Sequence, residues 1–267
     1  MGYKYETYTV ECKEKRLILV TDIHNCHECW QGVSSADRME ILCECLLEEY
    51  ERRPYDVILA LGDYSLDFWV CKEGGSFLWN SPISNTDNFV KEYVPRLPTD
   101  FYMIPGNHEQ YGEEDWRRIT GFPREYVIIY GDTIFVMLDT FAGDLDPKVN
   151  SDGTYTGINT EFLSQVLADY PDKRIILSAH NIEVKQESEA ARELILNNPR
   201  IVCAFAGHIH RSHTLILPDG WGRLPLFYCG DFSYTRGRKT EKNWGYRILD
   251  LSTADISTEY VRAKTTH

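Results

Sequence analysis

The 267-residue sequence predicts an α/β fold in which two packed mixed β-sheets are flanked by helices, four layers in the order α/β/β/α. Three observations favour this fold. Short continuous apolar runs such as Arg16–Thr21 (RLILVT) are typical of strands covered on both faces. These runs alternate with stretches of helical periodicity through the first two-thirds of the chain. After the last helix only strand-like runs follow, so we expect two sheets within one domain, 1–267.

The helices are predicted from apolar spacing and from their ends. Ser34 or Ser35 can cap a helix over about Ala36–Arg53, in which apolar residues recur at helical spacing until Pro54 ends it. Two further helices are predicted over Thr160–Leu167, capped by Thr160, and over Glu187–Leu196.

The strands are predicted from short apolar runs bounded by turn residues. A hairpin is expected where Tyr126–Tyr130 and Ile134–Asp139 flank the turn Gly131–Asp132. The other expected strands are Val57–Leu61, Phe101–Ile104, Arg174–Ser178, Ile201–Ala206, Leu215–Leu217, Leu224–Cys229, Tyr246–Leu251 and Ile256–Val261. We expect those in 214–262 to complete the second sheet around a motif core of about 16–213.

Composition excludes several classes of function. The net charge of -13 argues against a general nucleic-acid binder, because such proteins bind phosphates through lysine and arginine. No apolar run reaches the roughly 18 residues of a membrane span, and the N-terminus lacks a signal-peptide pattern. The eight cysteines are scattered, as expected of small buried residues in a reducing compartment. We therefore expect a cytoplasmic protein with no membrane partner.

Five strand-like runs end in residues that commonly bind metals. Each run and the residues after it are RLILVT with Asp22-Ile23-His24, VILAL with Gly62-Asp63, FYMIP with Gly106-Asn107-His108-Glu109, RIILSA with His180, and IVCAFA with Gly207-His208-Ile209-His210. Ligands of open α/β sheets gather beyond the carboxyl ends of strands, so one crevice could collect all five. One such histidine alone would more often be structural, but five coincidences predict a metal site.

The backbone and the donor atoms suggest how ions would be held. In extended backbone, residues two apart point the same way, so we expect Asp22 and His24 to bind one ion together. On a tight loop, His208 and His210 could be split between two ions. A mixed oxygen and imidazole shell suits Mn, Fe or Zn.

In this order the motifs resemble those of the calcineurin-like metallophosphoesterases, over about residues 16–213. The resemblance implies a two-sheet core flanked by helices and two divalent or trivalent ions, with Asp63 as the shared ligand. It implies that the first ion is held by Asp22, His24, Asp63 and His210, and the second by Asp63, Asn107, His180 and His208.

The resemblance also implies a reaction. A dinuclear phosphoesterase would hydrolyse a small phosphomonoester or phosphodiester by attack of a metal-bridging hydroxide. Two ions about 3.5–4 Å apart can clamp a phosphoryl group and lower the pKa of bound water. His108 and Asp63 would be the catalytic residues, with His108 giving a proton to the leaving alkoxide. The alternative for His108 is a loop histidine bonded to a backbone carbonyl.

The chain differs from the family's usual sequence pattern at positions where substrate contacts are expected. Leu66 stands where many members carry Asp or Asn, and Phe68-Trp69 lies where protein phosphatases have an arginine, so a phosphoprotein substrate is disfavoured. We expect substrate contacts from Asn107, Tyr64, Trp69, Asn181 and Arg236. Aromatic residues of the long loop after Asp63 could stack on a base or instead tie that loop to the core. The basic run that contains Arg236 could instead be a solvated turn.

Three alternatives stay open in the sequence. Cys26-His27-Glu28-Cys29 could form part of a zinc site, but no matching second cysteine pair follows, and the role of Cys26 and Cys29 is undecided. A related nuclease would carry a basic face, which is not evident. A non-catalytic scaffold tends to lose the histidine at position 108 or a ligand, and none is lost here. The substrate's identity, the native metals and the oligomeric state are not predicted.

Overall fold

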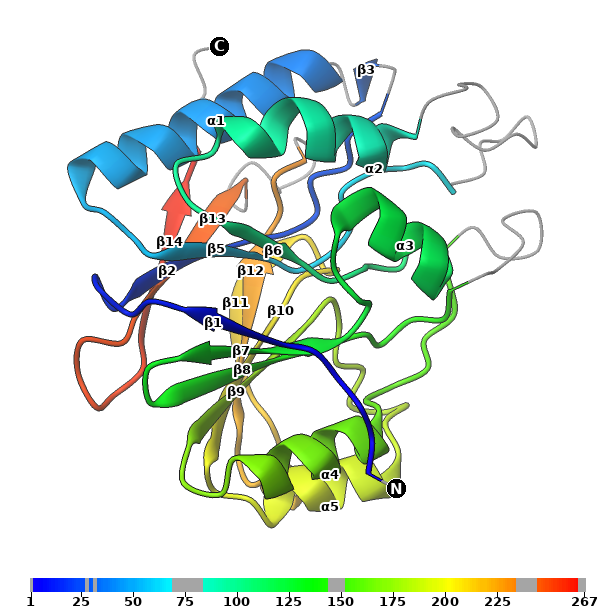
Figure 1. Cartoon of the computed structure of the whole chain (residues 1–267), viewed down its shortest axis with the longest axis vertical. Helices are drawn as coiled ribbons and strands as arrows, with labels where there is room; N and C mark the ends of the chain where they lie inside the picture. Colours follow the sequence, from blue (N-terminus) through cyan, green and yellow to red (C-terminus); the bar gives the residue numbers. More distant parts are fainter. Residues whose placement is uncertain are drawn as a thin grey trace.

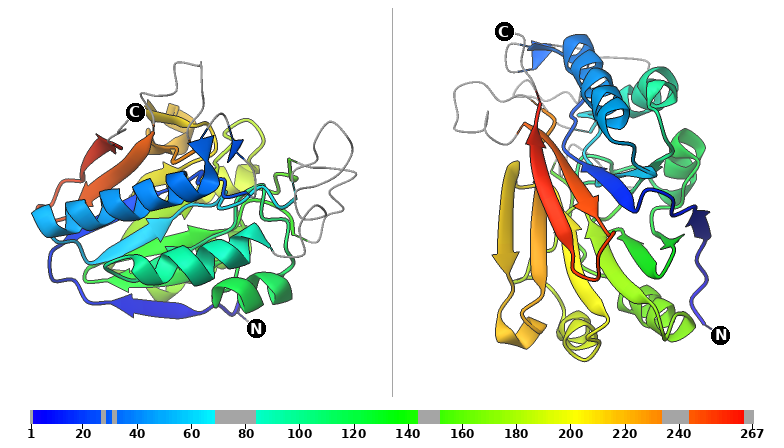
Figure 2. Two further views of the ribbon diagram at one scale, coloured as in Figure 1. Left: turned by 90° about the horizontal axis from the view of Figure 1, so that it is seen from above. Right: turned by 90° about the vertical axis from the view of Figure 1, so that its left-hand side faces the viewer.

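The computed structural model describes residues 2–26, 29–30, 33–68, 84–143, 152–233 and 244–263. Two β-sheets lie face to face between helices, with α1, α2 and α3 against one sheet and α4 and α5 against the other (Figure 1). The view from the side in Figure 2 shows the same layers. The expected four-layer α/β/β/α fold is confirmed.

The smaller sheet has the strand order β14-β13-β2-β5-β6. Its strands are β2 (Arg16–Val20), β5 (Val57–Ala60), β6 (Phe101–Met103), β13 (Gly245–Asp250) and β14 (Ser257–Arg262). β2, β5 and β6 are parallel, whereas β13 pairs antiparallel with both β2 and β14. The three parallel strands therefore end at one edge of the sheet.

The larger sheet has the order β1-β7-β8-β9-β10-β12-β11. Its strands are β1 (Thr7–Val10), β7 (Tyr126–Tyr130), β8 (Thr133–Leu138), β9 (Arg174–Ala179), β10 (Ile201–Ala206), β11 (Arg211–Ile216) and β12 (Pro225–Gly230). β8, β9, β10 and β12 run parallel, and β11 returns antiparallel as an edge strand. A two-stranded ribbon of β3 (Cys29–Trp30) and β4 (Val33–Ser34) lies outside both sheets.

Among the described α-helices, all but α3 begin after a residue whose side chain accepts a main-chain N–H, which leaves fewer donors unpaired. The α-helices are α1 (Ser35–Arg52), α2 (Asn85–Asn88), α3 (Glu113–Thr120), α4 (Thr160–Asp169) and α5 (Glu189–Leu196). The shorter turns are η1 (Phe89–Tyr93), η2 (Val94–Arg96) and η3 (Asp219–Trp221). Ser34 caps α1, and Asn159 rather than the expected Thr160 caps α4. Among the described residues, no helix is both long and apolar enough to cross a membrane.

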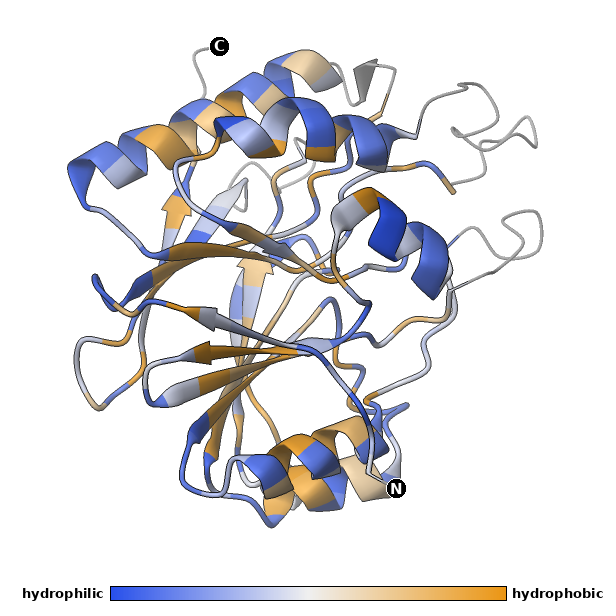
Figure 3. Cartoon of the chain, viewed as in Figure 1, coloured by the Kyte–Doolittle hydropathy of each residue, from blue (hydrophilic) through white to orange (hydrophobic). Residues whose placement is uncertain are grey.

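The apolar strands are continuous because both of their faces are buried. In β2, Leu17 and Leu19 face the larger sheet, whereas Ile18 and Val20 face the helices. The same alternation in β8 sends Phe135 towards the smaller sheet. Orange, apolar ribbon accordingly fills the central strands in Figure 3, while α1 alternates between blue and orange and α3 is largely blue. Burial of this kind dominates the favourable free energy of folding.

Two expectations about the strands are wrong. The strands of 214–262 do not complete one sheet: β11 and β12 extend the larger sheet, and β13 and β14 extend the smaller one. This division covers the edge of β2 with β13, so the buried strand keeps its hydrogen bonds on both sides. The strand expected over Leu215–Leu217 begins earlier, at Arg211, because its exposed polar residues hide it from an apolar pattern.

The sequence pattern also missed β1 and α3. β1 is a half-exposed edge strand, and its burial alternates too weakly to signal a strand. α3 is short and strongly charged, and it buries only Trp116 and Ile119. Its anchoring contact is the Trp116 indole, which is fully buried and donates to the carbonyl of Pro123.

A mostly buried carboxylate ties the N-terminal segment to this framework. Glu125, just before β7, accepts hydrogen bonds from the Tyr3 hydroxyl and from Nδ2 of Asn159, at 2.7 Å for the latter. Burial is the largest cause that raises the pKa of Glu125, to about 7. Its charged form is therefore disfavoured in the folded state.

Replacing Glu125 with glutamine should remove part of the pH dependence of stability. Because the folded pKa of about 7 exceeds the ordinary 4.5, the stabilisation is complete below pH 4.5 and is lost as the pH rises through 7. The wild-type free energy of unfolding should therefore fall relative to that of Glu125→Gln by about 1–3 kcal/mol from about pH 4.5 to 8. Urea unfolding at each pH measures this, and a constant difference would contradict it.

Candidate metal centre

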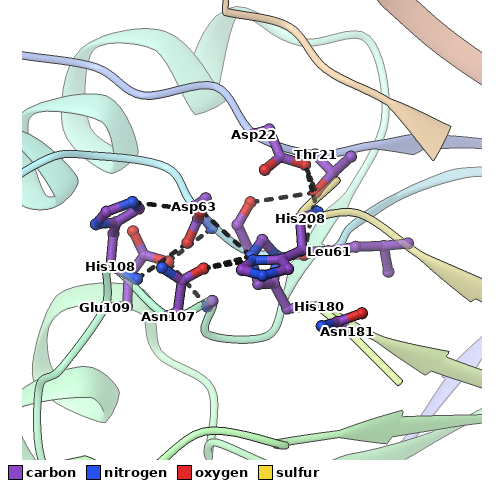
Figure 4. Close-up of polar contacts among 12 residues, drawn as sticks. Thr21, Asp22, Leu61, Asp63, Asn107, His108, Glu109, His180, Asn181 and His208 are labelled. Atoms are coloured by element: carbon purple, nitrogen blue, oxygen red, sulfur yellow. Dashed lines mark hydrogen bonds and ion pairs between the residues drawn. The ribbon is translucent and has the colours of Figure 1, made fainter. Parts of the chain in front are cut away.

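The residues after five strands meet at one end of the sandwich. β2, β5 and β6 of the smaller sheet and β9 and β10 of the larger sheet all point their carboxyl ends to this place. The close-up in Figure 4 shows side chains from these loops turned towards one another. Segments nearly two hundred residues apart thus share one crevice, as expected for the switch region of parallel sheets.

A first group of donor atoms comes from Asp22, His24, Asp63 and His210. One ligand atom of each lies within 4.8 Å of the others. Nε2 of His24 and Nε2 of His210 are 3.1 Å apart, and Nε2 of His210 is 3.1 Å from Oδ1 of Asp22. The other oxygen of Asp22 accepts from the Thr21 hydroxyl at 2.8 Å and from the His208 N–H at 2.9 Å. Oδ1 is therefore the Asp22 oxygen that remains available to bind an ion.

A second group comes from Asp63, His180 and His208, whose ligand atoms also lie within 4.8 Å of one another. Oδ1 of Asn107 completes it, 2.9 Å from both Nε2 of His180 and Nδ1 of His208. Nδ1 of His180 is 2.6 Å from the carbonyl of Leu61, and an N–H there would leave Nε2 free to bind an ion.

Asp63 lies between the two groups. Its Oδ2 is 3.8 Å from Nε2 of His24 on one side and 3.2 Å from Nε2 of His180 on the other. Its Oδ1 accepts from the His108 N–H at 3.0 Å, which fixes the carboxylate plane. One carboxylate thus faces both candidate ion positions.

The loops that carry these residues turn sharply. Five donors have left-handed backbone, with φ of 55° at Asp22, 50° at His24, 58° at Asp63, 67° at His208 and 51° at His210. Such residues cost roughly 1–3 kcal/mol each when they are not glycine, and they cluster at functional sites. The expected extended backbone from Asp22 to His24 is therefore wrong, although both side chains still enter one group.

The absence of a side chain at Gly106 lets the loop after β6 lie close to the Asp63 carboxylate. A Cβ at Gly106 would lie 2.2 Å from Oδ1 of Asp63, closer than any real contact. A side chain there would push the shared carboxylate out of place.

The donors fit metal ions. Oδ1 of Asp22 is buried and accepts no hydrogen bond, although His210 Nε2 is 3.1 Å away. A buried carboxylate oxygen without a hydrogen-bond donor is unfavourable unless a cation binds it. Nε2 of His24 and Nε2 of His210, 3.1 Å apart, would both be within reach of one ion. Imidazole nitrogen with carboxylate and amide oxygen is a donor set for first-row transition metals.

The charges of the centre also favour the binding of cations. Burial opposes a charge on His180, but the Asp63 carboxylate raises its pKa to about 9. For His210, burial is likewise outweighed by Asp22, and its pKa also rises to about 9. Burial lowers the pKa of His24 to about 4. Two buried carboxylates thus draw positive charge to this place, which bound cations would supply.

His108 stands beside the shared carboxylate. Its Nε2 is 3.9 Å from Oδ2 of Asp63, and its ring packs edge-on against His24 with centroids 5.3 Å apart. No hydrogen bond holds its buried Nδ1 among the described residues, so the predicted alternative of a ring bonded to a backbone carbonyl is not observed there.

The predicted substrate contacts are only partly placed. Tyr64 cannot stack on a substrate, because it is fully buried and its hydroxyl donates to the carbonyls of Ala60 and Ile104; that expectation is corrected. Asn181 is buried beside His180, and its side chain lies apart from the ligand groups in Figure 4. Trp69 and Arg236 lie outside the described residues.

Sequence reasoning missed the charged residues that hold the ligand loops. The Arg38 guanidinium, on the buried face of α1, donates to the carbonyls of Ile23 at 3.1 Å and of His24 at 3.0 Å. Arg124 donates to the carbonyls of Glu109 and Phe141 and pairs with Asp139, joining loops of the two sheets. A lone arginine on an apolar helix face was the available signal for Arg38.

Two further residues lie close to the first group. Cys26 is buried, its Sγ lies 3.4 Å from the Ser35 hydroxyl, and its side chain is free of disulfides. Asp231 follows β12, and the pairing of Arg211 with Gly230 places it near His210. Burial is the main cause that raises the pKa of Asp231, which no sequence motif had singled out.

Known proteins share this architecture. Residues 15–212 match the family model for calcineurin-like phosphoesterases. A probable glycerophosphodiester phosphodiesterase, GpdQ, of Arcobacter nitrofigilis is 23% identical over 239 residues, which are 78% of this chain and 75% of the relative.

Solved structures show the same fold. A dimetal phosphatase from Danio rerio has a TM-score of 0.61 at 13% identity, covering 88% of this chain and 92% of that one. GAP50, the anchor in the inner membrane complex of Plasmodium, has a TM-score of 0.54 at 14% identity, covering 94% and 85%. Because the family model matches residues 15–212, more than half of this chain, the chain belongs to the calcineurin-like phosphoesterase family and is a metal-dependent phosphoric ester hydrolase.

Proposed function

We propose that this enzyme hydrolyses a small phosphodiester or phosphomonoester at a centre of two Mn, Fe or Zn ions with Asp63 as their shared ligand. The observation that carries this proposal is the position of Asp63 Oδ2 between the two groups of donors, 3.8 Å from His24 Nε2 and 3.2 Å from His180 Nε2. Asp22, His24 and His210 would hold one ion, and Asn107, His180 and His208 the other.

The residues of the centre have distinct tasks in hydrolysis. Two bound ions would supply Lewis acidity towards the phosphoryl oxygens and lower the pKa of a bound water. The Thr21 hydroxyl and the His208 N–H hold one oxygen of Asp22, so that the other stays fixed in the centre. In the same way the His108 N–H fixes the plane of Asp63. Groups fixed in advance lose little entropy when the substrate arrives.

His108 is the proposed proton donor to the leaving oxygen. Its Nε2 lies 3.9 Å from Oδ2 of the shared carboxylate, so a proton on Nε2 would be near a phosphoryl group bound by the two ions. Histidine is the side chain that most often serves as a general acid.

The substrate is proposed to be small. The relative from Arcobacter nitrofigilis bears the name of a phosphodiesterase, which favours a diester. Asn107 and Asn181, with Trp69 and Arg236, remain proposed substrate contacts. The net charge of -13 disfavours nucleic acid. Six cysteines in the described part are not joined in disulfides, which supports a cytoplasmic setting.

The same fold also serves as an anchor in GAP50 of Plasmodium, so fold alone does not decide between catalysis and a scaffold. In this chain both donor groups are complete and His108 is retained. Those features support catalysis, and the acidic surface charge argues against the nuclease alternative.

Elemental analysis and hydrolysis assays should show that Asp63 serves both ions. Wild-type protein reconstituted with Mn²⁺ should hold two ions per chain and hydrolyse bis(4-nitrophenyl) phosphate. Asp63→Asn should lose metal and reduce kcat/KM by more than about 100-fold, because a neutral amide replaces the charged carboxylate that both ions would share. Asp132→Asn, at a fully exposed aspartate, is the control and should match wild type. Full activity in Asp63→Asn would refute the proposed centre.

Substrates with different leaving groups should reveal the role of His108. His108→Gln should reduce kcat by about 10²–10⁴-fold for an alkyl phosphodiester, whose alkoxide needs a proton. The loss should be much smaller for 4-nitrophenolate, which leaves without protonation, and the metal content should stay at two. Equal losses for both substrates would exclude a proton donor at this position.

A further inference from the structure

Glu109 is a fully buried carboxylate without a cationic partner in the described part of the chain. Four main-chain N–H groups donate to it. Oε2 accepts from Asp63 at 2.7 Å and from Gly106 at 2.9 Å, and Oε1 accepts from Tyr64 at 2.9 Å and from Ser65 at 3.1 Å. A carboxylate has about four acceptor positions, so all of its capacity is used by the backbone.

The four donors belong to two loops. Three are consecutive residues of the loop after β5, and the fourth lies in the loop after β6, directly before Asn107 and His108. One side chain therefore fastens the loop of the shared ligand to the loop of a ligand of the second ion. One of the N–H groups bound by Glu109 is that of Asp63, whose φ of 58° is unfavourable for a residue with a side chain.

We propose that Glu109 is a positioning residue that holds Asp63 and Asn107 in their ion-binding arrangement before the ions arrive. This inference rests on the proposed two-metal centre. Without the clamp, the strained turn at Asp63 would relax, and each ion would have to restore it on binding. Because Asp63 is shared, both sites should weaken together.

Glutamine cannot replace this carboxylate. It keeps the shape of the side chain but offers one oxygen and one NH₂ group. The NH₂ would face two main-chain N–H groups, so two buried donors would lose their acceptor. Aspartate keeps the charge and all four acceptor positions but is one methylene shorter, and it cannot reach both loops at once.

The test measures Mn²⁺ binding rather than activity. Metal-free protein is titrated with Mn²⁺, and free Mn²⁺ is followed by its electron paramagnetic resonance signal. Glu109→Gln should raise the Kd for Mn²⁺ at both sites by about 10–100-fold, the usual effect of removing a partner that orients metal ligands. Glu125→Gln, at another mostly buried carboxylate with a raised pKa, is the matched control and should bind as wild type does.

Urea unfolding of the metal-free variants separates positioning from stability. A merely structural role would lower the unfolding midpoint of Glu109→Gln but leave the Kd for Mn²⁺ unchanged, and this result would overturn the inference. If Glu109→Gln does not fold, Glu109→Asp decides: a Kd raised by about tenfold or more supports positioning, and an unchanged Kd excludes it. If wild type binds no Mn²⁺, the two-metal proposal itself fails, a result distinct from equal binding by wild type and variant.

Discussion

The ligand loops leave buried strands and reverse within one or two residues, and this tight turning is the constraint on which the centre depends. Residues such as Asp63 must adopt left-handed backbone so that short side chains from five strands reach one point. Such conformations are unfavourable for residues other than glycine. They persist only where the surroundings fix them, so much of the nearby structure serves to hold the turns.

Buried charged side chains supply that support by binding main-chain groups. Arg38 fastens the loop after β2 through two carbonyls, and Glu109 fastens the loops after β5 and β6 through four N–H groups. Arg124 joins the loop after β6 to the segment after β8. Donors and acceptors of the turning backbone, which cannot pair within a strand, find partners in this way.

Much of this could be predicted from the sequence. Continuous apolar runs identify β2, β5, β9 and β10, because strands buried on both faces contain few polar residues. The residues that follow them identify the donors. Sheet membership of the C-terminal strands could not be predicted, because apolar alternation does not reveal a strand's neighbour. Tyr64 was misplaced since an aromatic next to a ligand looks the same in sequence whether it faces solvent or core. Hydrogen bonds from Glu109 and Arg38 to the main chain leave no sequence pattern.

Each candidate ion position draws ligands from both sheets. In the first, Asp22 and His24 follow a strand of the smaller sheet and His210 follows one of the larger. In the second, His180 and His208 follow strands of the larger sheet and Asn107 follows one of the smaller. The distances between the donor atoms of each position therefore depend on how the two sheets stack. Residues such as Leu19 and Phe205, buried between the sheets, act as spacers of fixed thickness. Interior side chains with no chemistry of their own thus help to set the geometry of the donor groups, and a change in their packing would alter that geometry without replacing a ligand.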